Sequence, residues 1–353
     1  MINKKIRVLI VDDSRFVQTI LTKGLSLDPE IEVIGSAADP YEARDKIVNL
    51  KPDVLTLDVE MPKMNGLEFL KKLMPQYPMP VIMVSSLTNR SSQITLDALS
   101  AGAVDFVVKP SPNLDGGLSG LIEVIQEKIK IASKVNVKNR QSGKSSSKEI
   151  QSIEGCSGLA LHSKIIAIGA STGGTDAIET IIKTFPKNMP STVIVQHMPT
   201  GFTKLFADRI NSKCQVNVKE AESGDILSPG TVLIAPGGYQ MTLVKTNLEY
   251  RVLCRQGELV CGHAPSVEVL FNSVAQVAGP NAIGVMLTGM GHDGADAMVK
   301  MRKAGAKTMA QDEATSVVFG MPKEAYERGG AEVLVPLDRI PTKVNQYLFT
   351  GDK

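Results

Sequence analysis

Short apolar runs alternate with segments of helical periodicity along the first third of the chain. The runs typical of buried strands cover residues 6–11, 31–35, 54–57, 81–84 and 106–108. Apolar positions recur at helical spacing over residues 16–25, 41–50, 67–73, 94–101 and 121–131. Strands that alternate with helices predict a doubly wound parallel sheet with helices on both faces. We therefore predict an α/β domain over residues 1–132.

The alternation stops at residue 133. Residues 133–158 are rich in Ser, Lys, Asn, Gln and Gly and carry few large apolar side chains. Such a segment cannot bury enough apolar surface to offset the entropy lost on ordering. We therefore predict a flexible linker over these residues.

A second α/β pattern follows the linker. Strand-like runs cover residues 165–168, 193–195, 231–235, 241–244, 251–254 and 283–287. Helical spacing covers residues 177–185, 267–277 and 295–304. We predict a second α/β domain with a mainly parallel sheet over residues 159–353.

Composition narrows the class of protein. Apolar residues make up 43% and charged residues 22% of the 353, which is typical of globular proteins. The formal net charge is only +2, and no apolar run is long enough to span a bilayer. We therefore expect neither nucleic-acid binding nor membrane insertion. The charged start, Met1 to Arg7, runs straight into the first strand, so we also expect no signal peptide.

The four cysteines, Cys156, Cys214, Cys254 and Cys261, show no CxxC spacing. Free thiols in a reducing, cytoplasmic compartment are therefore expected. A metal cluster of Cys254, Cys261 and His263 is the disfavoured alternative, because it fits none of the usual zinc spacings.

Polar side chains stand at the ends of the predicted strands of the first domain. Asp12 and Asp13 follow the first strand, and Asp58 follows the third. The fourth strand runs into Ser85, and the fifth ends at Lys109. Function collects at the carboxyl ends of parallel strands, and three converging carboxylates would repel one another without a cation such as Mg²⁺. Asp58 could then act as a nucleophile toward a phosphoryl group, with Mg²⁺ and Lys109 countering the added charge and Ser85 bonding the new oxygens.

This domain resembles the response-regulator receiver family over about residues 4–128. The resemblance rests on the segments VLIVDDS (8–14), LDVEMP (57–62), NG (65–66) and VVKP (107–110). It implies a flavodoxin-like fold. It also implies that Ser85 is the switch hydroxyl and Lys109 the lysine that contacts the phosphate.

The receiver resemblance further implies a phosphorylation site and a metal site. Asp58 is the phosphoacceptor by this resemblance. Mg²⁺ would be held by Asp13, Asp58 and the backbone carbonyl of Glu60, with Asp12 assisting.

The second domain places a serine on a Gly-rich turn between a strand and a helix. Ser171 follows the strand at residues 165–168, and small neighbours would let a substrate carbonyl approach it. The N-terminus of the following helix offers free N–H groups, which are the parts of an oxyanion hole. His197 follows the next strand, and Asp293 lies shortly after the strand at residues 283–287. Ser171, His197 and Asp293 therefore make a plausible catalytic triad.

Two alternatives to this triad stay open. A Gly-rich strand-to-helix turn alone is also typical of nucleotide or phosphate binding. An α/β-hydrolase order, serine then acid then histidine, could instead use Asp225 with His263 or His292. We interpret His263 alone as structural or substrate-adjacent rather than as the base.

The second domain is similar to the family of chemotaxis protein-glutamate methylesterases, CheB. With the receiver and the linker, the similarity covers nearly the whole chain. It rests on IGASTGG (168–174), QHMP (196–199), FT (202–203), IAPG (234–237), PSV (265–267), LTGMG (287–291), DG (293–294) and GMP (320–322).

The resemblance to CheB implies an activity. Glutamyl methyl esters on chemoreceptors would be hydrolysed with release of methanol, and receptor glutamines deamidated, which gives sensory adaptation. Ser171, His197 and Asp293 would be catalytic, with Thr172 and Met290 lining the oxyanion region. No cofactor is expected in the catalytic domain, and the histidine kinase CheA is the expected phosphodonor.

Two residues depart from the pattern of this family. His292 stands where some relatives have Asn, and Gln240 stands where many have His. Both lie beside the predicted triad, so they bear on substrate preference rather than on reaction class. The competing class of protein is a receiver fused to a nucleotide- or phosphate-binding module. A DNA-binding output is less favoured, because no helix-turn-helix pattern is present.

Overall fold

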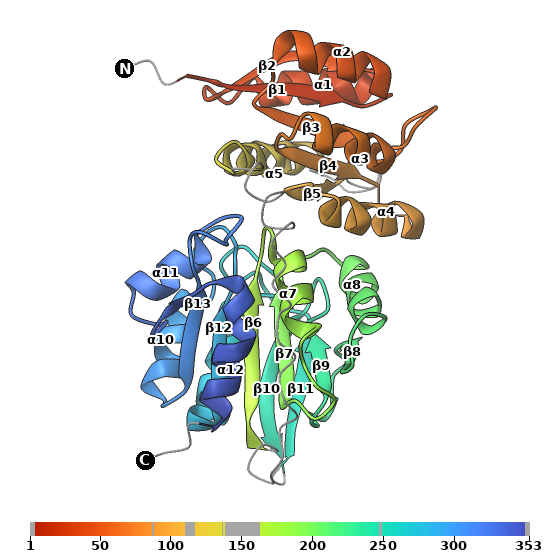
Figure 1. The fold of residues 1–353 in the computed structure, drawn as a ribbon. Helices are drawn as coiled ribbons and strands as arrows, with labels where there is room; N and C mark the ends of the chain where they lie inside the picture. Colours follow the sequence, from red (N-terminus) through yellow and green to blue (C-terminus); the bar gives the residue numbers. More distant parts are fainter. Residues whose placement is uncertain are drawn as a thin grey trace. The chain divides into compact units, whose positions relative to one another are not determined.

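The structure is a computed structural model that describes residues 4–86, 88–109, 117–135, 137, 163–246 and 249–349, without the side chains of residues 89 and 117–119. The chain forms two compact units, Met1–Ser147 and Lys148–Lys353, which are described one at a time (Figure 1). Most of the predicted linker, with Cys156, lies outside the described residues, as does Pro110. The predicted domain boundaries stay predictions.

The first unit contains a five-stranded sheet in which all neighbouring strands are parallel, in the order β2-β1-β3-β4-β5. Its strands are β1 (Ile6–Val11), β2 (Ile31–Ala37), β3 (Val54–Asp58), β4 (Val81–Ser85) and β5 (Asp105–Val108). This order is flavodoxin-like and reverses between β1 and β3, where ligands bind in such sheets. The predicted doubly wound fold is therefore confirmed.

Helices cover both faces of this sheet (Figure 1). They are α1 (Arg15–Leu25), α2 (Pro40–Leu50), α3 (Gly66–Gln76), α4 (Asn89–Ser100) and α5 (Gly117–Ala132). α1 packs against α5, whereas α3 packs against α2 and α4. Helices α1 to α4 begin after a residue whose side chain accepts a hydrogen bond from the first turn: Ser14, Asp39, Asn65 and Thr88. Thr88 explains why α4 begins five residues before the predicted start at residue 94.

The second unit contains a seven-stranded sheet in the order β14-β13-β12-β6-β7-β9-β8, in which all neighbours are parallel. Its strands are β6 (Ile165–Ala170), β7 (Ser191–Gln196), β8 (Asn217–Glu220), β9 (Thr231–Ile234), β12 (Ala282–Met286), β13 (Lys307–Gln311) and β14 (Leu334–Val335). An antiparallel hairpin, β10 (Gln240–Thr246) and β11 (Glu249–Arg255), stands apart from this sheet. The predicted mainly parallel α/β fold is confirmed.

The helices of the second unit are α7 (Gly174–Ile182), α8 (Phe202–Asn211), α9 (Val267–Val277), α10 (Ala295–Lys303), α11 (Met321–Glu327) and α12 (Ile340–Phe349). Two 3-10 turns cover Gly279–Asn281 and Leu337–Arg339. α9 packs on β6, β7 and β12, and it also packs against α10 and β10. Phe271 of α9 and Met241 and Leu243 of the hairpin belong to one buried core.

Several of these elements lie outside the predicted strands and helices. Helices α8, α11 and α12 and strands β8, β13 and β14 fall in stretches for which no element was predicted. β8 and β14 are the two edge strands, and they are four and two residues long. β8 carries mainly polar side chains and β14 has only two residues, so neither gives the pattern of a typical buried strand.

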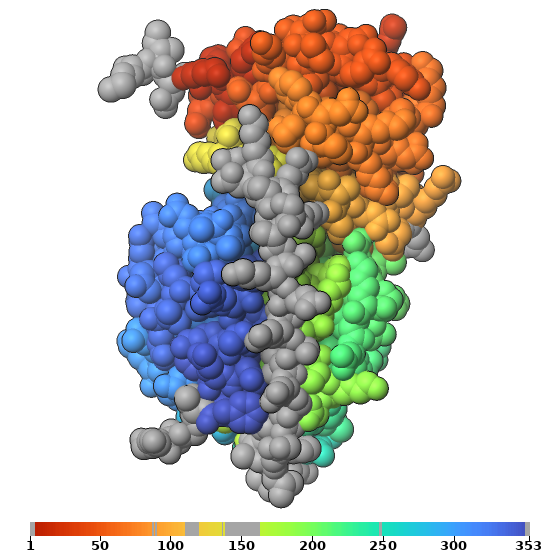
Figure 2. Space-filling view, viewed as in Figure 1, coloured from red at the N-terminus to blue at the C-terminus, as the bar shows by residue number. Residues whose placement is uncertain are grey.

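The interior of each unit is filled by side chains. Large apolar side chains such as Leu9 and Ile10 in the first unit and Phe185 and Phe271 in the second are fully buried, and the space-filling view shows the outer face of each unit (Figure 2). In the second unit, every residue of β6, β7 and β12 is buried, which is expected for central strands of a parallel sheet. Among the described helices, none is long and apolar enough to cross a bilayer.

Candidate functional site

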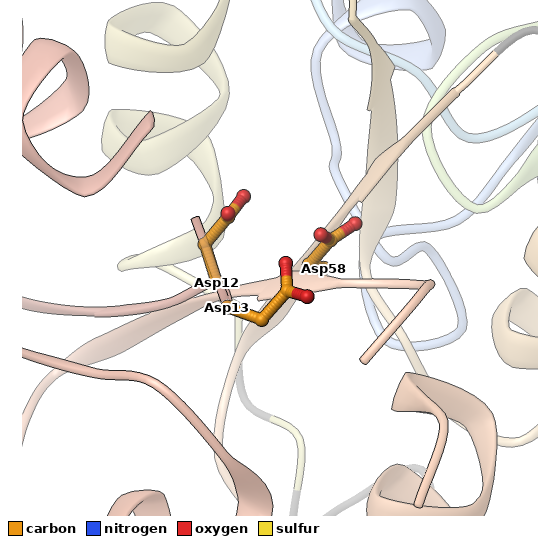
Figure 3. A group of neighbouring side chains, drawn as sticks. All are labelled: Asp12, Asp13 and Asp58. Atoms are coloured by element: carbon orange, nitrogen blue, oxygen red, sulfur yellow. The ribbon is translucent and has the colours of Figure 1, made fainter. Parts of the chain in front are cut away.

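Three carboxylates meet at the strand ends of the first unit. Asp12 and Asp13 follow β1, and Asp58 ends the neighbouring β3 (Figure 3). One carboxylate oxygen from each lies within 4.8 Å of the others, which makes them the one such group of possible metal ligands among the described residues. Oxygen donors of this kind suit Mg²⁺. The three residues therefore fit the metal that the receiver family implies.

Lys109 lies beside this acidic group. Its ammonium donates to the carboxylates of Asp12 and Asp58, with both distances 2.9 Å. Burial raises the pKa of Asp58 to about 6, because the favourable effect of Lys109 does not offset burial and the nearby Asp12 charge. Burial opposes the charge of Lys109 as well, but the two carboxylates outweigh it and raise the pKa of Lys109. One lysine thus leaves the pocket short of positive charge.

The predicted switch hydroxyl lies close by, in a buried network. Ser85 Oγ accepts a hydrogen bond from Thr95 Oγ1 of α4 at 2.8 Å and donates to the Ser86 carbonyl at 3.2 Å. The Glu60 carboxylate accepts from Ser91 Oγ, also in α4, at 2.6 Å. These hydroxyls therefore connect the strand ends around Asp58 to the start of α4.

The second candidate site lies where the order of the seven-stranded sheet reverses. The chain runs from β6 to β7 on one side and returns to β12 on the other side of β6. Ser171 follows β6 directly, His197 follows β7 directly, and Asp293 lies in the loop between β12 and α10. This crevice is the expected place for a ligand in an open parallel sheet.

The structure joins His197 and Asp293 directly. His197 Nε2 lies 2.8 Å from Asp293 Oδ2, and the side chains of the two residues are only 8% and 2% exposed. Nδ1 of His197 is buried and has no hydrogen-bond partner among the described residues. The pair thus has the geometry of a base oriented by an acid, with one ring nitrogen left for a proton.

Ser171 is tied to His197 through the backbone and a neighbouring side chain. The His197 N–H donates to the Ala170 carbonyl at 3.1 Å, and Gln196 Nε2 donates to the Ser171 carbonyl at 2.9 Å. The hydrogen bonds of the described residues include none between the side chains of Ser171 and His197. Catalytic hydrogen bonds are often long without substrate, so this geometry does not remove Ser171 from the site.

Asp293 is held by the start of α9. Its carboxylate accepts hydrogen bonds from Ser266 Oγ at 2.7 Å and from the backbone N–H groups of Val267 at 2.7 Å and Glu268 at 2.9 Å. Burial disfavours the charge, but the hydrogen bond and charge of His197, followed by those from Ser266 and Glu268, hold the pKa of Asp293 below its usual value. The carboxylate therefore stays ionised beside His197.

Two glycines let the loops of this site meet. A Cβ on Gly289 would lie 2.8 Å from Ser171 Cβ, so only glycine allows the loop after β12 to reach the serine. Gly173 precedes α7 with a φ of 79°, a left-handed conformation that favours glycine. The backbone at both positions therefore gives a structural reason for glycine.

The predicted oxyanion region is partly engaged. The Ser171 N–H donates to the Thr288 carbonyl at 3.0 Å, and the Thr288 hydroxyl donates to the Thr172 carbonyl at 2.9 Å. Thr172 is buried, whereas the Met290 side chain is 39% exposed at the rim of the same loop. The N–H of the serine itself is therefore occupied, and an oxyanion donor has to come from a neighbouring backbone group.

The alternative constellations do not assemble. Asp225 accepts from Lys219 Nζ at 3.0 Å and from the Glu222 N–H at 2.8 Å, within its own turn. Burial raises the pKa of Cys254 to about 11, which disfavours the thiolate that zinc would need. Among the described residues, the cysteines at 254 and 261 form no group of possible metal ligands with His263.

The contacts of three residues that build this site were not predicted, although His263 was interpreted as structural or substrate-adjacent rather than as the base. Ser266 was noted only as part of the PSV segment, and Gln240 only as a departure from the family pattern. The ring of His263 stacks on the ring of His197, with centroids 3.6 Å apart and an angle of 16° between the planes. A serine directly before a predicted helix was the one usable signal, because such residues accept hydrogen bonds from the first turn. Here Asp293 fills that place instead, and Ser266 makes no such bond.

Comparisons with known proteins support this geometry. Residues 166–344 match the CheB methylesterase family, and residues 8–115 match the response regulator receiver domain. The chain is 57% identical to a protein-glutamate methylesterase/protein-glutamine glutaminase of Syntrophotalea carbinolica, over 98% of both chains. It is 52% identical to a protein of the same description from Sulfurimonas denitrificans, over 97% of this chain and 98% of the relative.

A solved structure is similar to the second unit. The crystal structure of the Thermotoga maritima CheB methylesterase catalytic domain is 40% identical and gives a TM-score of 0.51. It covers 52% of this chain and 97% of its own. The similarity in sequence therefore extends to the fold around the second site.

Proposed function

Because the chain belongs to the CheB methylesterase family, we propose that it is a serine hydrolase that removes methyl groups from glutamate methyl esters of chemoreceptors. We also propose that it deamidates receptor glutamines, as the names of its relatives suggest for them. The two activities give sensory adaptation in chemotaxis. The contact of His197 with Asp293 at 2.8 Å, beside Ser171 at the reversal of the sheet, carries the proposal.

The reaction proceeds by acyl transfer. Ser171 Oγ attacks the ester carbonyl carbon while His197 takes the hydroxyl proton at Nδ1. The tetrahedral intermediate collapses when His197 returns that proton to the methoxy oxygen, and methanol leaves. Water, deprotonated by His197, then attacks the glutamyl–serine ester, which releases glutamate and restores the Ser171 hydroxyl. An amide follows the same path and releases ammonia.

Asp293 and the neighbouring backbone support this chemistry. The Asp293 carboxylate fixes the imidazole through Nε2 and stabilises its positive charge after proton transfer. Because the Ser171 N–H is bonded to Thr288, we assign the oxyanion to backbone N–H groups around Met290, with Thr172 lining the same region. Donors held by packed loops need no reorganisation during the reaction.

The first unit regulates this hydrolase through phosphorylation of Asp58. When bound, Mg²⁺ would supply positive charge to the pocket, held by Asp13, Asp58 and the Glu60 carbonyl with help from Asp12. Lys109 already contacts Asp58 and can neutralise part of the phosphoryl charge. The Ser85 hydroxyl would leave Thr95 to bond a phosphoryl oxygen, which couples the charge of Asp58 to α4.

The proposal includes the partners of the enzyme. Methylated chemoreceptors are the substrates, and the chemotaxis histidine kinase CheA is the phosphodonor. Neither nucleic acid nor membrane insertion is needed for the reaction. A cytoplasmic location belongs to the proposal as well, because it would keep the free thiols of Cys214, Cys254 and Cys261 reduced.

The test is methanol release from methylated receptor membranes, with and without acetyl phosphate and Mg²⁺. Wild type should be activated by phosphorylation, whereas Asp58→Asn should keep only its basal rate. Ser171→Ala should lose about 10³- to 10⁶-fold in kcat, as triad variants do. A Ser171→Ala variant whose kcat stays within a few-fold of wild type would contradict the proposed triad and leave the receiver assignment intact.

A nucleotide- or phosphate-binding module is the competing function. Tight nucleotide binding by wild type, with no methanol released from a competent receptor, would favour it. The geometry gives it less support, because a simple phosphate site has no use for a buried His197–Asp293 pair.

A further inference from the structure

His263 makes a contact with the catalytic base that the mechanism above does not use. His263 comes from the loop between β11 and α9, whereas His197 follows β7. Their rings lie face to face, with centroids 3.6 Å apart and planes 16° from parallel. We infer that His263 is a positioning residue that fixes the ring plane of His197. This inference rests on the proposed role of His197 as the base.

The catalytic imidazole needs such a restraint. The hydrogen bond to Asp293 fixes the place of Nε2 but leaves the ring able to tilt about that contact. The χ2 angle of histidine is a broad, roughly two-fold torsion, so the side chain itself sets the plane only weakly. A tilt moves Nδ1, the atom that has to meet the Ser171 proton. A flat partner against the ring face resists this tilt.

His263 is presented on a tight two-residue hairpin turn. The N–H groups of Val260 and His263 each donate to the carbonyl of the other, both at 3.0 Å. The central residues Cys261 and Gly262 have φ values of 52° and 80°, positive at both positions as in a type I′ turn. Cys261 is not a glycine, so this conformation is strained. Strain of this kind persists where the surroundings determine the backbone, and it is common at functional sites.

The Gln240 side chain ties this turn to the rest of the site. Its Nε2 donates to the His263 carbonyl at 2.9 Å and to the Glu258 carbonyl at 3.1 Å. Its Oε1 accepts from the Ser266 N–H at 2.9 Å, and Ser266 Oγ in turn donates to Asp293. One carboxamide therefore holds both the residue that stacks on the base and the residue that bonds the acid.

The contact acts on orientation rather than on proton transfer. A ring that lies parallel to His197 meets the face of the imidazole, whereas the protons of the reaction move in the plane of that ring at Nδ1 and Nε2. Any flat aromatic side chain of similar size should therefore replace His263. A side chain without a ring should not.

The experiment compares His263→Phe and His263→Ala in the full chain. The first readout is the rate at which a fluorophosphonate probe labels Ser171, which reports on serine activation without the receptor. The second is kcat and KM for methanol release. His263→Ala should lower the labelling rate and kcat about 10- to 100-fold with little change in KM, because small misplacements of a catalytic group have effects of this size. His263→Phe should stay within about three-fold of wild type.

His292→Asn is the matched control. It removes an exposed imidazole next to Asp293 without touching the stacked ring, and its labelling rate should match wild type. Equal losses in His263→Phe and His263→Ala would overturn the inference, since a nitrogen rather than a flat ring would then be needed. A wild-type rate in His263→Ala would overturn it as well. If His263→Ala does not fold, a large loss in a folded His263→Phe still refutes it.

The same experiment separates this inference from the proposed function. If the probe does not label wild type, the triad fails and the role of His263 falls with it. If wild type is labelled and His263→Ala is labelled equally fast, the triad stands and only the positioning role is wrong.

Discussion

Asp58 and Asp293 are both buried carboxylates at the carboxyl edge of a parallel sheet, yet their surroundings shift their pKa values in opposite directions. Asp58 is 4% exposed and Asp293 is 2% exposed. Burial raises the pKa of Asp58 to about 6, whereas the pKa of Asp293 lies below its usual value. At a similar degree of burial, the pKa values of the two carboxylates therefore shift in opposite directions.

The difference lies in what each carboxylate meets. Asp58 shares Lys109 with a second carboxylate, Asp12, and the backbone hydrogen bond that its carboxylate accepts from Glu60 is long at 3.4 Å. Asp293 accepts from a hydroxyl, an imidazole and two backbone N–H groups at a helix start. A pocket short of positive charge is suited to a metal ion and a phosphoryl group. A carboxylate with several hydrogen-bond donors, such as Asp293, is suited to orient the imidazole of His197.

The largest expected effect concerns catalysis. Asp293→Asn should lower kcat for methanol release by about 10⁴-fold, because an amide cannot stabilise the imidazolium and favours the wrong tautomer. The measurement is methanol release from methylated receptors without phosphodonor. Asp58→Asn is the matched control and should keep the unphosphorylated rate. A loss of less than about ten-fold in Asp293→Asn would show that the acid is not needed.

The same two substitutions should change stability with opposite signs. In EDTA at pH 7, Asp58→Asn should stabilise the first unit, because it removes a buried charge that the pocket does not satisfy. The pKa of Asp58 moves from 3.8 to about 6, and one pKa unit is about 1.36 kcal/mol, so the gain is about 3 kcal/mol at most. Asp293→Asn should destabilise the second unit by about 1.5–3 kcal/mol through weaker hydrogen bonds. Hydrogen exchange followed by mass spectrometry reads each unit separately.

Acid should remove these two effects in different pH windows. A raised pKa stabilises the folded state below pH 3.8 relative to higher pH, and this contribution is lost as pH rises to about 6. The advantage of Asp58→Asn should therefore shrink as pH falls from 6 toward 4. A lowered pKa gives stability that is present above 3.8 and lost below it, so the cost of Asp293→Asn should persist until pH falls below 3.8. Parallel pH profiles for the two variants would contradict the comparison.

Metal binding should follow the titration of Asp58. Mg²⁺ needs the ionised carboxylate, so its affinity should fall about ten-fold for each pH unit below 6. Isothermal titration of the full chain between pH 5 and pH 7 measures this. Asp13→Asn should weaken binding at every pH and keep the slope. A flat affinity across this range would mean that a proton does not compete with the metal at Asp58.

The smallest expected effect tests how evenly Asp293 is held. Ser266→Ala removes the hydroxyl that donates to the Asp293 carboxylate and leaves the two backbone N–H groups and His197 in place. Labelling of Ser171 by a fluorophosphonate should slow about three- to ten-fold, which corresponds to about 1 kcal/mol. A loss as large as that of Asp293→Asn would mean that the hydroxyl, rather than the helix start, holds the acid.

Much of this fold, and the grouping of residues at both candidate sites, could be predicted from the strand ends. The periodicity placed β1, β3 and β6 near their observed bounds, and the rule that parallel strands share a carboxyl edge brought Asp12 to Asp58 and His197 to Asp293. The central strands are long apolar runs, so they are visible in one sequence. β8 is short and mostly polar and β14 is only two residues long, so both edge strands were missed.

The supporting contacts could not be predicted. Ser266 lies 27 positions before Asp293, and Gln240 lies 23 positions before His263, with no local pattern that links either pair. The stacking of His263 on His197 depends on a turn with positive φ at Cys261, a conformation that its sequence does not favour. Such contacts depend on tertiary structure and leave no periodic signal.

The carboxylate of Asp293 accepts hydrogen bonds from the first turn of α9, so the state of the proposed catalytic acid can be followed without any substrate. The amide protons of Val267 and Glu268 are hydrogen-bonded to that carboxylate. They should exchange with solvent only when these hydrogen bonds break. The exchange rates of these two amides would therefore report, in the protein without substrate, how often the Asp293 carboxylate loses these hydrogen bonds. Opening of the first turn of α9 and loss of the orientation of Asp293 would then be one event, observed by hydrogen exchange and by activity.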